Sequence, residues 1–202
     1  MKKVVIIGKA NAGKTLFAIN FGFYLGNAKL RIAATYPDGA TVNQTYPPTK
    51  AREELTSEQP HQTRCLQRMT LGLPAGKGVK RFQIIDTSGL IEGIPPEAQI
   101  RRAIAQTLAT VREADLILHL IDASRVKQEG AVEAIGEVDY QVAQFAQMRS
   151  GYGILANKMD LPTAAQGLEI IRREFVGHRI IPISALYREG FQEVKEFVWR
   201  HL

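Results

Sequence analysis

The sequence contains little cysteine and no long apolar run. Cys65 is the only cysteine among 202 residues, which excludes an internal disulfide and argues against a zinc cluster. No apolar run approaches the roughly 18 residues that a membrane-spanning helix needs. Only four apolar residues follow Met1-Lys2-Lys3, too few for the core of a signal peptide. These absences predict a cytoplasmic protein without a membrane span.

The composition predicts one folded domain of ordinary size over residues 1–202. Hydrophobic residues make up 45% and charged residues 23% of the chain, which is typical of globular proteins. Strand-like and helix-like segments alternate, which predicts an α/β fold with helices on both faces of a mostly parallel six-stranded sheet. One antiparallel edge strand should come from a hairpin over Cys65–Asp86. The expected strands are Lys3–Ile7, Cys65–Leu71, Arg81–Asp86, Leu116–Asp122, Tyr152–Ala156 and Arg179–Ile183.

The most informative motif is a glycine-rich segment directly after the first expected strand. Residues 8–15 match G-x-x-x-x-G-K-[ST], in which backbone N–H groups surround phosphate oxygens. Lys14 supplies charge to the β- and γ-phosphates, and the Thr15 hydroxyl is a Mg²⁺ ligand. The helix that begins here directs the positive end of its dipole at the same anion. We therefore expect nucleotide contacts from Asn11, Ala12, Gly13, Lys14, Thr15 and Leu16.

A second motif predicts which base is bound. Asn157-Lys158-Met159-Asp160 follows an apolar segment and matches N-K-x-D. The Asp160 carboxylate can accept hydrogen bonds from guanine N1–H and the 2-amino group, whereas adenine would leave it unpaired. The stem of Lys158 can lie along the purine face, and Asn157 is expected to tether neighbouring loops. Together with the phosphate motif, this pattern predicts a guanine nucleotide.

Two weaker motifs complete the set. Asp86-Thr87-Ser88-Gly89 matches D-x-x-G, in which the aspartate holds Mg²⁺ through water and the Gly89 N–H meets the γ-phosphate. The segment Ser184-Ala185-Leu186 follows another apolar run and can offer a backbone N–H to guanine O6. Four motifs in this order, each after an apolar run, strongly indicate a site for a guanine nucleotide.

With these motifs the chain resembles the translation-factor-related P-loop GTPases, and within them the branch of Era, MnmE, FeoB and Obg. The phosphate loop is similar to the G-x-P-N-x-G-K-[ST] of MnmE and Era. Residues 36–42, Tyr-Pro-Asp-Gly-Ala-Thr-Val, look like a FeoB switch I with one residue extra, and Leu90 stands where Ras-like proteins carry glutamine. The resemblance implies a Ras-like G domain that hydrolyses GTP to GDP and phosphate with Mg²⁺.

The resemblance also implies a catalytic set that is incomplete. Lys14 and Gly89 would bind the phosphates, and Thr41 would close onto Mg²⁺ and the γ-phosphate, with Thr35 and Thr45 as fallbacks. Leu90 cannot orient water, so hydrolysis should be slow without help. A partner could supply a residue, or K⁺ could bind beside Asn11 as in MnmE and FeoB. The implied metal ligands are Thr15, Thr41 and Asp86.

The region from residue 27 to about 63 is predicted to be irregular, a mobile extension of switch I. The segment between Asn43 and Phe82 contains seven Lys or Arg and three Glu, and the whole chain carries a net charge of +6. This charge favours a GTPase switch that acts on RNA or ribosome assembly. The alternative is a regulatory module with little turnover that controls a protein partner or dimerises through its G domain. A nucleotide-binding protein without useful turnover also stays open.

Overall fold

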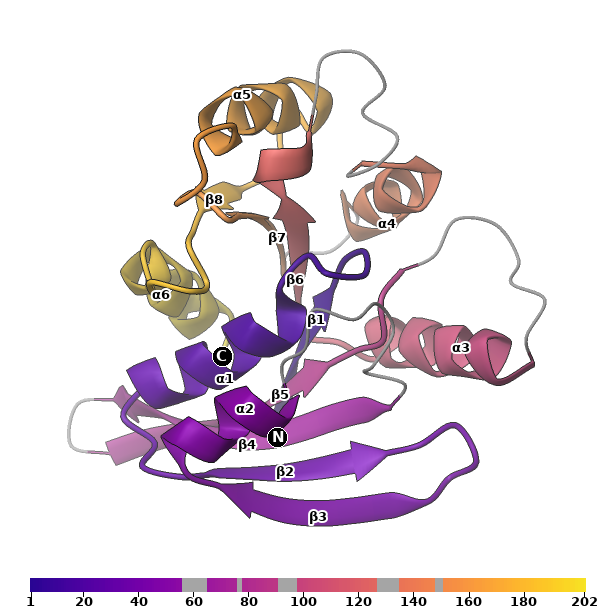
Figure 1. Cartoon of the computed structure of the whole chain (residues 1–202), viewed down its shortest axis with the longest axis vertical. Helices are drawn as coiled ribbons and strands as arrows, with labels where there is room; N and C mark the ends of the chain where they lie inside the picture. Colours follow the sequence, from indigo (N-terminus) through magenta and orange to yellow (C-terminus); the bar gives the residue numbers. More distant parts are fainter. Residues whose placement is uncertain (56–64, 76–77, 91–97, 127–134, 148–150) are drawn as a thin grey trace.

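The computed structural model describes residues 1–55, 65–75, 78–90, 98–126, 135–147 and 151–202. These residues form one eight-stranded sheet in the order β3-β2-β4-β5-β1-β6-β7-β8 (Figure 1). The strands are β1 (Lys2–Ile7), β2 (Leu30–Thr35), β3 (Thr41–Tyr46), β4 (Leu66–Ala75), β5 (Gly78–Asp86), β6 (Leu116–Asp122), β7 (Tyr152–Asn157) and β8 (Ile180–Pro182). The helices are α1 (Lys14–Tyr24), α2 (Pro48–Leu55), α3 (Ala98–Arg112), α4 (Glu137–Gln147), α5 (Ala164–Glu174) and α6 (Phe191–His201), with a 3₁₀ turn η1 (Ala123–Arg125).

Helices cover both faces of the sheet, and strand β1 shows why. Its side chains alternate between two buried clusters, since successive residues of a strand point to opposite faces. Val4 and Ile6 pack with residues of α1, α2 and α6. Val5 and Ile7 pack with residues of α3, α4 and α5. The α/β class and the helices on both faces, both predicted from the sequence, are therefore confirmed.

The sheet is mostly parallel with one antiparallel side. Strands β5, β1, β6, β7 and β8 pair in parallel. The predicted hairpin forms between β4 and β5, with Gln67 opposite Asp86. Strand β4 is not the edge, however, because β2 pairs with it and β3 pairs with β2, both antiparallel. In the described residues the sheet thus has eight strands rather than the predicted six.

The prediction of an irregular segment from residue 27 to about 63 was wrong for most of its length. Residues 30–46 form the β2–β3 hairpin, and Pro48–Leu55 form helix α2. Residues 56–63 lie outside the described residues. The period-two signal is weak because β3 is exposed on both faces except at Tyr46, so it has no apolar alternation. Backbone pairing with β2 holds this polar strand in place.

The sequence pattern also predicts helices over Lys14–Leu25, Pro96–Glu113, Ala164–Phe175 and Phe191–His201, and in the described residues α1, α3, α5 and α6 agree with it. The start of α4 differs. The apolar spacing predicts a helix over 127–149, but Ile135 and Gly136 precede the helix and Glu137 is its first residue. Residues 127–134 and 148–150 lie outside the described residues. Among the helices that are described, none has the length and apolar character of a membrane span.

Candidate functional site

All four motifs lie in loops at the carboxyl ends of neighbouring strands. The phosphate loop, residues 8–15, follows β1, the D-x-x-G segment follows β5, and the N-K-x-D segment follows β7. Strand register brings them level, because Ile6 lies opposite Asp86 and Asp122 opposite Asn157. Ligands of open α/β sheets bind at this edge. The fold therefore brings the four motifs to one edge of the sheet.

The backbone of the phosphate loop is held in an unusual conformation. Gly8 (φ 142°), Asn11 (φ 61°) and Gly13 (φ 93°) all have positive φ. A Cβ on Gly8 would lie 2.2 Å from the Leu120 carbonyl oxygen, and one on Gly13 would lie 2.4 Å from Asn157 Nδ2. Only glycine fits at these two positions. The loop therefore curls against its neighbours and leads into α1, whose first residue is Lys14.

Lys14 is a buried cation at the centre of this loop. Its Nζ donates to the Lys9 carbonyl oxygen at 2.8 Å. Burial lowers the Lys14 pKa to about 8, against the opposing effect of the Asp86 and Asp139 carboxylates. A buried ammonium is stabilised by an anion. The arrangement is thus suited to a phosphate group, which would replace the carbonyl as the partner of Lys14.

Asp86 and Thr15 form the part of the site that fits a magnesium ion. The Thr15 hydroxyl donates to Asp86 Oδ2 at 2.6 Å. Burial raises the Asp86 pKa to about 6, although Lys14 and the Thr15 hydrogen bond lower it in part. Within the part of the chain that the structure describes, the buried Oδ1 of Asp86 has no hydrogen-bond partner. A hydroxyl and a carboxylate with a spare oxygen are the hard donors that Mg²⁺ prefers.

The D-x-x-G segment is attached directly to the phosphate loop. A Cβ on Gly89 would lie 2.8 Å from the Ala10 backbone nitrogen, so only glycine allows this approach. The Leu90 N–H donates to the Gly8 carbonyl oxygen at 2.9 Å, and Lys9 and Leu90 form a β-bridge. Leu90 is 8% exposed and belongs to the apolar core. It therefore has a structural role and presents no polar group to water.

The N-K-x-D segment connects the two ends of the site. Asn157 Nδ2 donates to the Ala12 carbonyl oxygen at 2.7 Å, and its Oδ1 accepts from the Ala185 N–H at 2.9 Å. The predicted tether is confirmed by these two bonds. The Ser184 hydroxyl donates to Asp160 Oδ1 at 2.6 Å, so Ser184 sets the direction of the exposed Asp160 carboxylate.

Lys158 is held by a carboxylate on the neighbouring strand. Its Nζ lies 2.6 Å from Asp122 Oδ2, and its backbone has a positive φ of 67°. With its ammonium fixed at β6, the apolar stem of Lys158 can cover a flat ring. Leu186 is 47% exposed at the other predicted base-contacting segment. The site thus offers a carboxylate and an apolar surface, which suit a guanine base. The Ala185 N–H of the segment expected to meet guanine O6 donates to Asn157 Oδ1, so the backbone donor to O6 stays a prediction.

Sequence reasoning missed Asn20 and Arg52, which connect helix α2 to this end of the site. The fully buried Asn20 of α1 donates from Nδ2 to the Ala185 carbonyl oxygen at 2.6 Å. Its Oδ1 accepts from Arg52 Nε of α2 at 2.9 Å. The one available signal was a polar residue in the apolar run 16–25, where a buried amide needs partners.

The structure does not bring Thr41 to the other predicted metal ligands. Thr41 begins β3 and pairs with Thr35 of β2, their hydroxyl oxygens 3.2 Å apart. Strand β3 is three positions from β5, about 14 Å at the usual strand spacing. Asn11 is exposed on the phosphate loop. The roles predicted for Thr41 and Asn11 therefore stay predictions.

The fold and these loops define a P-loop protein with a guanine-type base site. The family model described as 50S ribosome-binding GTPase matches residues 3–158. Because that is most of the chain, the protein belongs to this GTPase family. The membership of the Era, Obg and FeoB type that the sequence predicted is thereby confirmed.

Relatives and solved structures agree with this assignment. The chain is 29% identical over 121 residues to "GTPase Obg" of Desulfatibacillum aliphaticivorans, covering 59% of this chain and 35% of that protein. It is 30% identical over 119 residues to the protein of the same name from Ruminiclostridium cellulolyticum, covering 57% of this chain and 27% of that protein. The chain thus matches about a third of the length of these relatives. Each comparison with a solved structure below has low identity and shows the fold alone.

Two solved structures illustrate the fold. Era in complex with MgGDPNP and nucleotides 1506–1542 of 16S ribosomal RNA has a TM-score of 0.66 at 21% identity, covering 100% of this chain and 56% of that one. The G domain of the T. maritima FeoB iron transporter has a TM-score of 0.58 at 18% identity, covering 100% and 98%. Both resemble this chain over its whole length.

Proposed function

We propose that the chain binds GTP and GDP and hydrolyses GTP as a magnesium-dependent molecular switch. The observation that carries the proposal is the convergence of four loops on one edge of the sheet. Lys14 and the Asp86–Thr15 pair lie at the phosphate end, and Asp160 with Ser184 lies at the base end. Asn157 connects the two ends. This support comes from geometry and from family membership.

The residues would contribute positioning and electrostatic stabilisation. Phosphates would bind at the N–H groups of the phosphate loop and at Lys14, and the Gly89 N–H would meet the γ-phosphate. Thr15 and Asp86 would hold Mg²⁺, which supplies positive charge that neutralises the charge developing on the phosphates. Attack by water would then release phosphate and leave GDP. Thr41 would join the Mg²⁺ ligands only after the β2–β3 hairpin has moved.

The direct test is binding of fluorescent GDP, GTP and ATP, followed by phosphate release in a single turnover. We expect tight binding of both guanine nucleotides, weak binding of ATP and slow phosphate release. Equal affinities for GTP and ATP would contradict the base assignment. Binding without any phosphate release would contradict the proposed hydrolysis of GTP.

Magnesium removal should weaken GTP binding only when the Asp86 carboxylate is present. EDTA is expected to lower the GTP affinity of the wild-type protein about tenfold or more, because Mg²⁺ neutralises phosphate charge. In Asp86→Asn the affinity should already be low and should change little with EDTA. Glu113→Gln, which removes a carboxylate beyond the opposite end of the sheet, is the matched control. An unchanged EDTA effect in Asp86→Asn would contradict the metal assignment.

Potassium stimulation follows from the proposed role of Asn11. If the exposed Asn11 helps bind a monovalent cation beside the phosphates, the single-turnover rate should be about tenfold higher in K⁺ than in Na⁺, since the cation would stabilise transition-state charge. Asn11→Ala should abolish the difference between the two salts. Equal wild-type rates in K⁺ and Na⁺ would remove the cation and leave activation by a partner.

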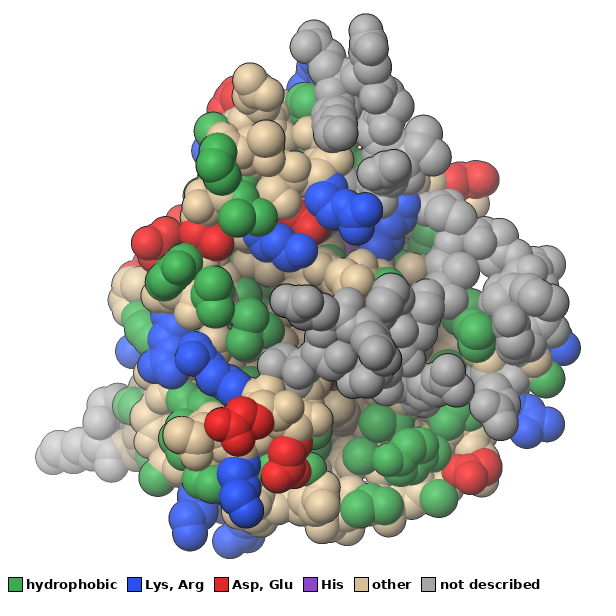
Figure 2. Space-filling view, viewed as in Figure 1, with side chains coloured by type: hydrophobic (Ala, Val, Ile, Leu, Met, Phe, Trp, Pro, Cys, Tyr) green, Lys and Arg blue, Asp and Glu red, His purple; other side chains and the backbone are tan. Residues whose placement is uncertain are grey.

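For the cellular role we propose an action on RNA or ribosome assembly. The support is the net charge of +6 with a pI near 9.5, the family's description, and the Era neighbour that holds 16S ribosomal RNA. On the face shown in Figure 2, Lys and Arg side chains stand in several groups with acidic side chains between them. The described residues of this face therefore show no continuous basic surface, and the support from charge is the net positive charge of the chain, which favours contacts with a phosphate backbone rather than with bases.

Affinity capture tests this role. The chain loaded with a non-hydrolysable GTP analogue, in parallel with GDP, would be the bait. Ribosomal particles or RNA bound only in the GTP state, and released steeply by salt, would support the proposal. Recovery of a single protein or of the chain itself would contradict it and favour the alternative below.

The alternative is a regulatory module with little intrinsic turnover that controls a protein partner or dimerises. One observation favours it: Leu90 is packed in the core, so the position that could orient water has no hydrogen-bonding group. The GTP and GDP states would then differ in shape, with hydrolysis acting only as a timer. A rate that depends on the second power of protein concentration would support dimerisation.

A further inference from the structure

A line of polar side chains crosses the apolar layer between the sheet and helix α4. It consists of Lys9 in the phosphate loop, Asp139 on α4, His119 on β6 and Tyr152 on β7. Lys9 Nζ lies 3.9 Å from Asp139 Oδ2, and His119 Nε2 lies 2.8 Å from Asp139 Oδ1. His119 Nδ1 lies 2.9 Å from the Tyr152 hydroxyl. His119 and Asp139 are 0% and 1% exposed.

The hydrogen bonds of this line are mutually consistent. A carboxylate only accepts, so His119 Nε2 must carry the proton and donate to Asp139. Nδ1 of the same ring pairs with the Tyr152 hydroxyl, with the donor set by the charge of the ring. Burial, together with the Asp139 charge, raises the pKa of Tyr152, which keeps that hydroxyl protonated. The Gly136 N–H donates to Asp139 Oδ2 at 2.9 Å. Asp139 is therefore fixed from both sides, and its second oxygen faces Lys9.

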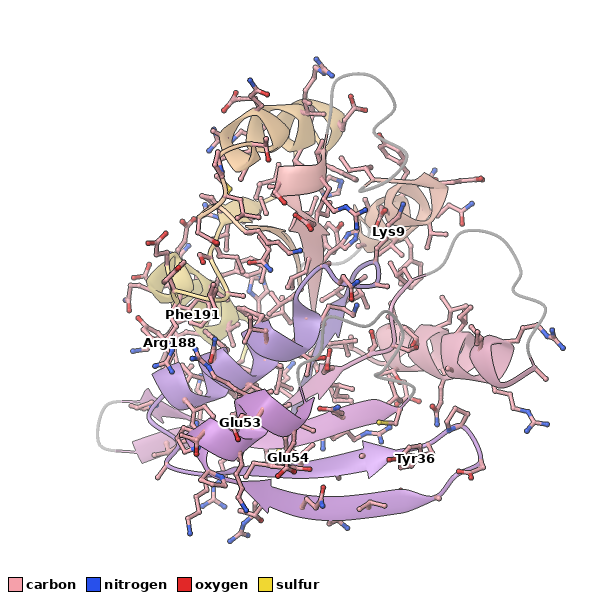
Figure 3. All side chains as sticks on the ribbon, in the orientation of Figure 1. Lys9, Tyr36, Glu53, Glu54, Arg188 and Phe191 are labelled. Carbon is pink, nitrogen blue, oxygen red and sulfur yellow. The ribbon has the colours of Figure 1, made fainter. Side chains whose placement is uncertain are left out.

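Lys9 itself links three parts of the nucleotide site. Its carbonyl oxygen accepts from Lys14 Nζ at 2.8 Å and from the Ala12 N–H at 3.3 Å. Its backbone forms the β-bridge with Leu90, directly after the D-x-x-G segment. Figure 3 shows Lys9 in the turn after β1, beside α4. A displacement of this one residue would therefore move Lys14, the lysine proposed to bind phosphate, together with the end of the D-x-x-G segment at Gly89 and Leu90.

We infer that Asp139 is a positioning residue for nucleotide binding: through Lys9 it fixes the phosphate loop against helix α4. The inference rests on the proposed function, because it concerns the same phosphate site. A buried ion pair adds little net stability, since desolvation offsets the attraction. Its main effect here is geometric: the side chain of Lys9 is drawn towards α4 while its carbonyl stays directed at Lys14. Neither Asp139 nor Lys9 needs to touch the nucleotide.

The test is a double-mutant cycle on GDP affinity with Lys9→Met, Asp139→Asn and the double variant. Each single change should weaken fluorescent GDP binding about tenfold, as expected when one member of a buried charge pair is removed. The double variant should be no weaker than the singles, because the pair acts as a unit. Lys9→Arg should stay within about twofold of the wild type, because it preserves the charge.

Glu137→Gln is the matched control, because Glu137 is an exposed acid in the first turn of the same helix. It should leave GDP affinity unchanged. Single variants within about twofold of the wild type, or effects that multiply to about 100-fold in the double variant, would overturn the inference. A lower melting temperature with unchanged GDP affinity would do the same.

Two further outcomes also decide the inference. If Asp139→Asn does not fold, the comparison of Lys9→Met with Lys9→Arg decides, and equal affinities would overturn the inference. If the wild-type chain binds no guanine nucleotide, the proposed function fails and takes this inference with it. Wild-type binding with unaffected variants leaves the proposed function intact and removes only the inference.

Discussion

Asp160→Asn is expected to reverse the base preference of the site from guanine to xanthine nucleotides. The carboxylate would accept hydrogen bonds from the N1–H and 2-amino groups of guanine. In Asp160→Asn one oxygen becomes an NH₂ donor that faces the 2-amino donor, and the negative charge is lost. GTP affinity should fall about 100-fold or more, the cost of leaving buried donors opposed to each other. Xanthosine triphosphate, which has an oxygen in place of the amino group, should gain affinity.

Ser184 makes this substitution a clean test. Its hydroxyl donates to Asp160 Oδ1, and an asparagine can keep that bond through its own oxygen. The amide nitrogen would then occupy the other position, towards the base. Competition of GTP and xanthosine triphosphate against a fluorescent guanine nucleotide measures the change, with Asp115→Asn at the far end of the sheet as the control. Unchanged GTP affinity in Asp160→Asn would show that the base assignment is wrong.

Lys14→Met is expected to remove most nucleotide affinity without weakening the fold. The ammonium would form charge-assisted hydrogen bonds to the β- and γ-phosphates, so its loss should lower GTP and GDP affinity about 100-fold or more. Burial opposes the charged form of Lys14 in the ligand-free protein. An apolar side chain of similar length should therefore leave the free energy of unfolding within about 1 kcal/mol of the wild type.

Titration calorimetry with GDP and thermal unfolding of the ligand-free protein check both parts of this prediction. Lys3→Met is the control, because Lys3 pairs with the exposed Glu113 at the opposite end of the sheet. Loss of affinity together with a large fall in the melting temperature would mean that Lys14 has a structural role. Unchanged affinity would mean that the phosphates bind elsewhere.

The parts of the site that the sequence predicted are those in which local chemistry dictates the residue. Gly8 and Gly13 are recognisable because only glycine fits there, and Asp86 because a carboxylate follows an apolar strand directly. The confirmed tether from Asn157 to Ala12 and Ala185 follows from the order of parallel strands. Side chains at the carboxyl ends of neighbouring strands meet whatever their separation in sequence.

The parts that the sequence did not predict depend on tertiary partners. Strand β3 carries no apolar alternation, so only its pairing with β2 defines it as a strand. Because His119 lies inside an apolar run, the sequence indicates a buried core residue. The burial is correct, but the sequence does not indicate which groups His119 hydrogen-bonds. Its partners Asp139 and Tyr152 come from two other elements, and no local spacing connects them.

The position of Thr41 in the structure is another feature that the sequence did not predict. The motif that resembles a switch I lies at the tip of the β2–β3 hairpin, where Gln106 of α3 donates to the Tyr36 carbonyl oxygen at 3.2 Å. Figure 3 shows Tyr36 at this tip, away from the phosphate loop. A sequence pattern identifies the residues of a switch, but it does not define which of its states a structure will show.

The buried Asn20 has a thermodynamic consequence for the segment that carries β2, β3 and α2. Asn20 joins Arg52 of α2 to the Ala185 carbonyl oxygen, and the Ala185 N–H in turn donates to Asn157 Oδ1. Coupling free energy between two sites is reciprocal. If bound guanine stabilises the Ala185 loop and thereby α2, it raises the affinity of a partner that binds α2. That partner must then raise the affinity for guanine by the same factor. The position of α2 would then depend on whether guanine is bound, whereas the γ-phosphate would act at the opposite end of the site.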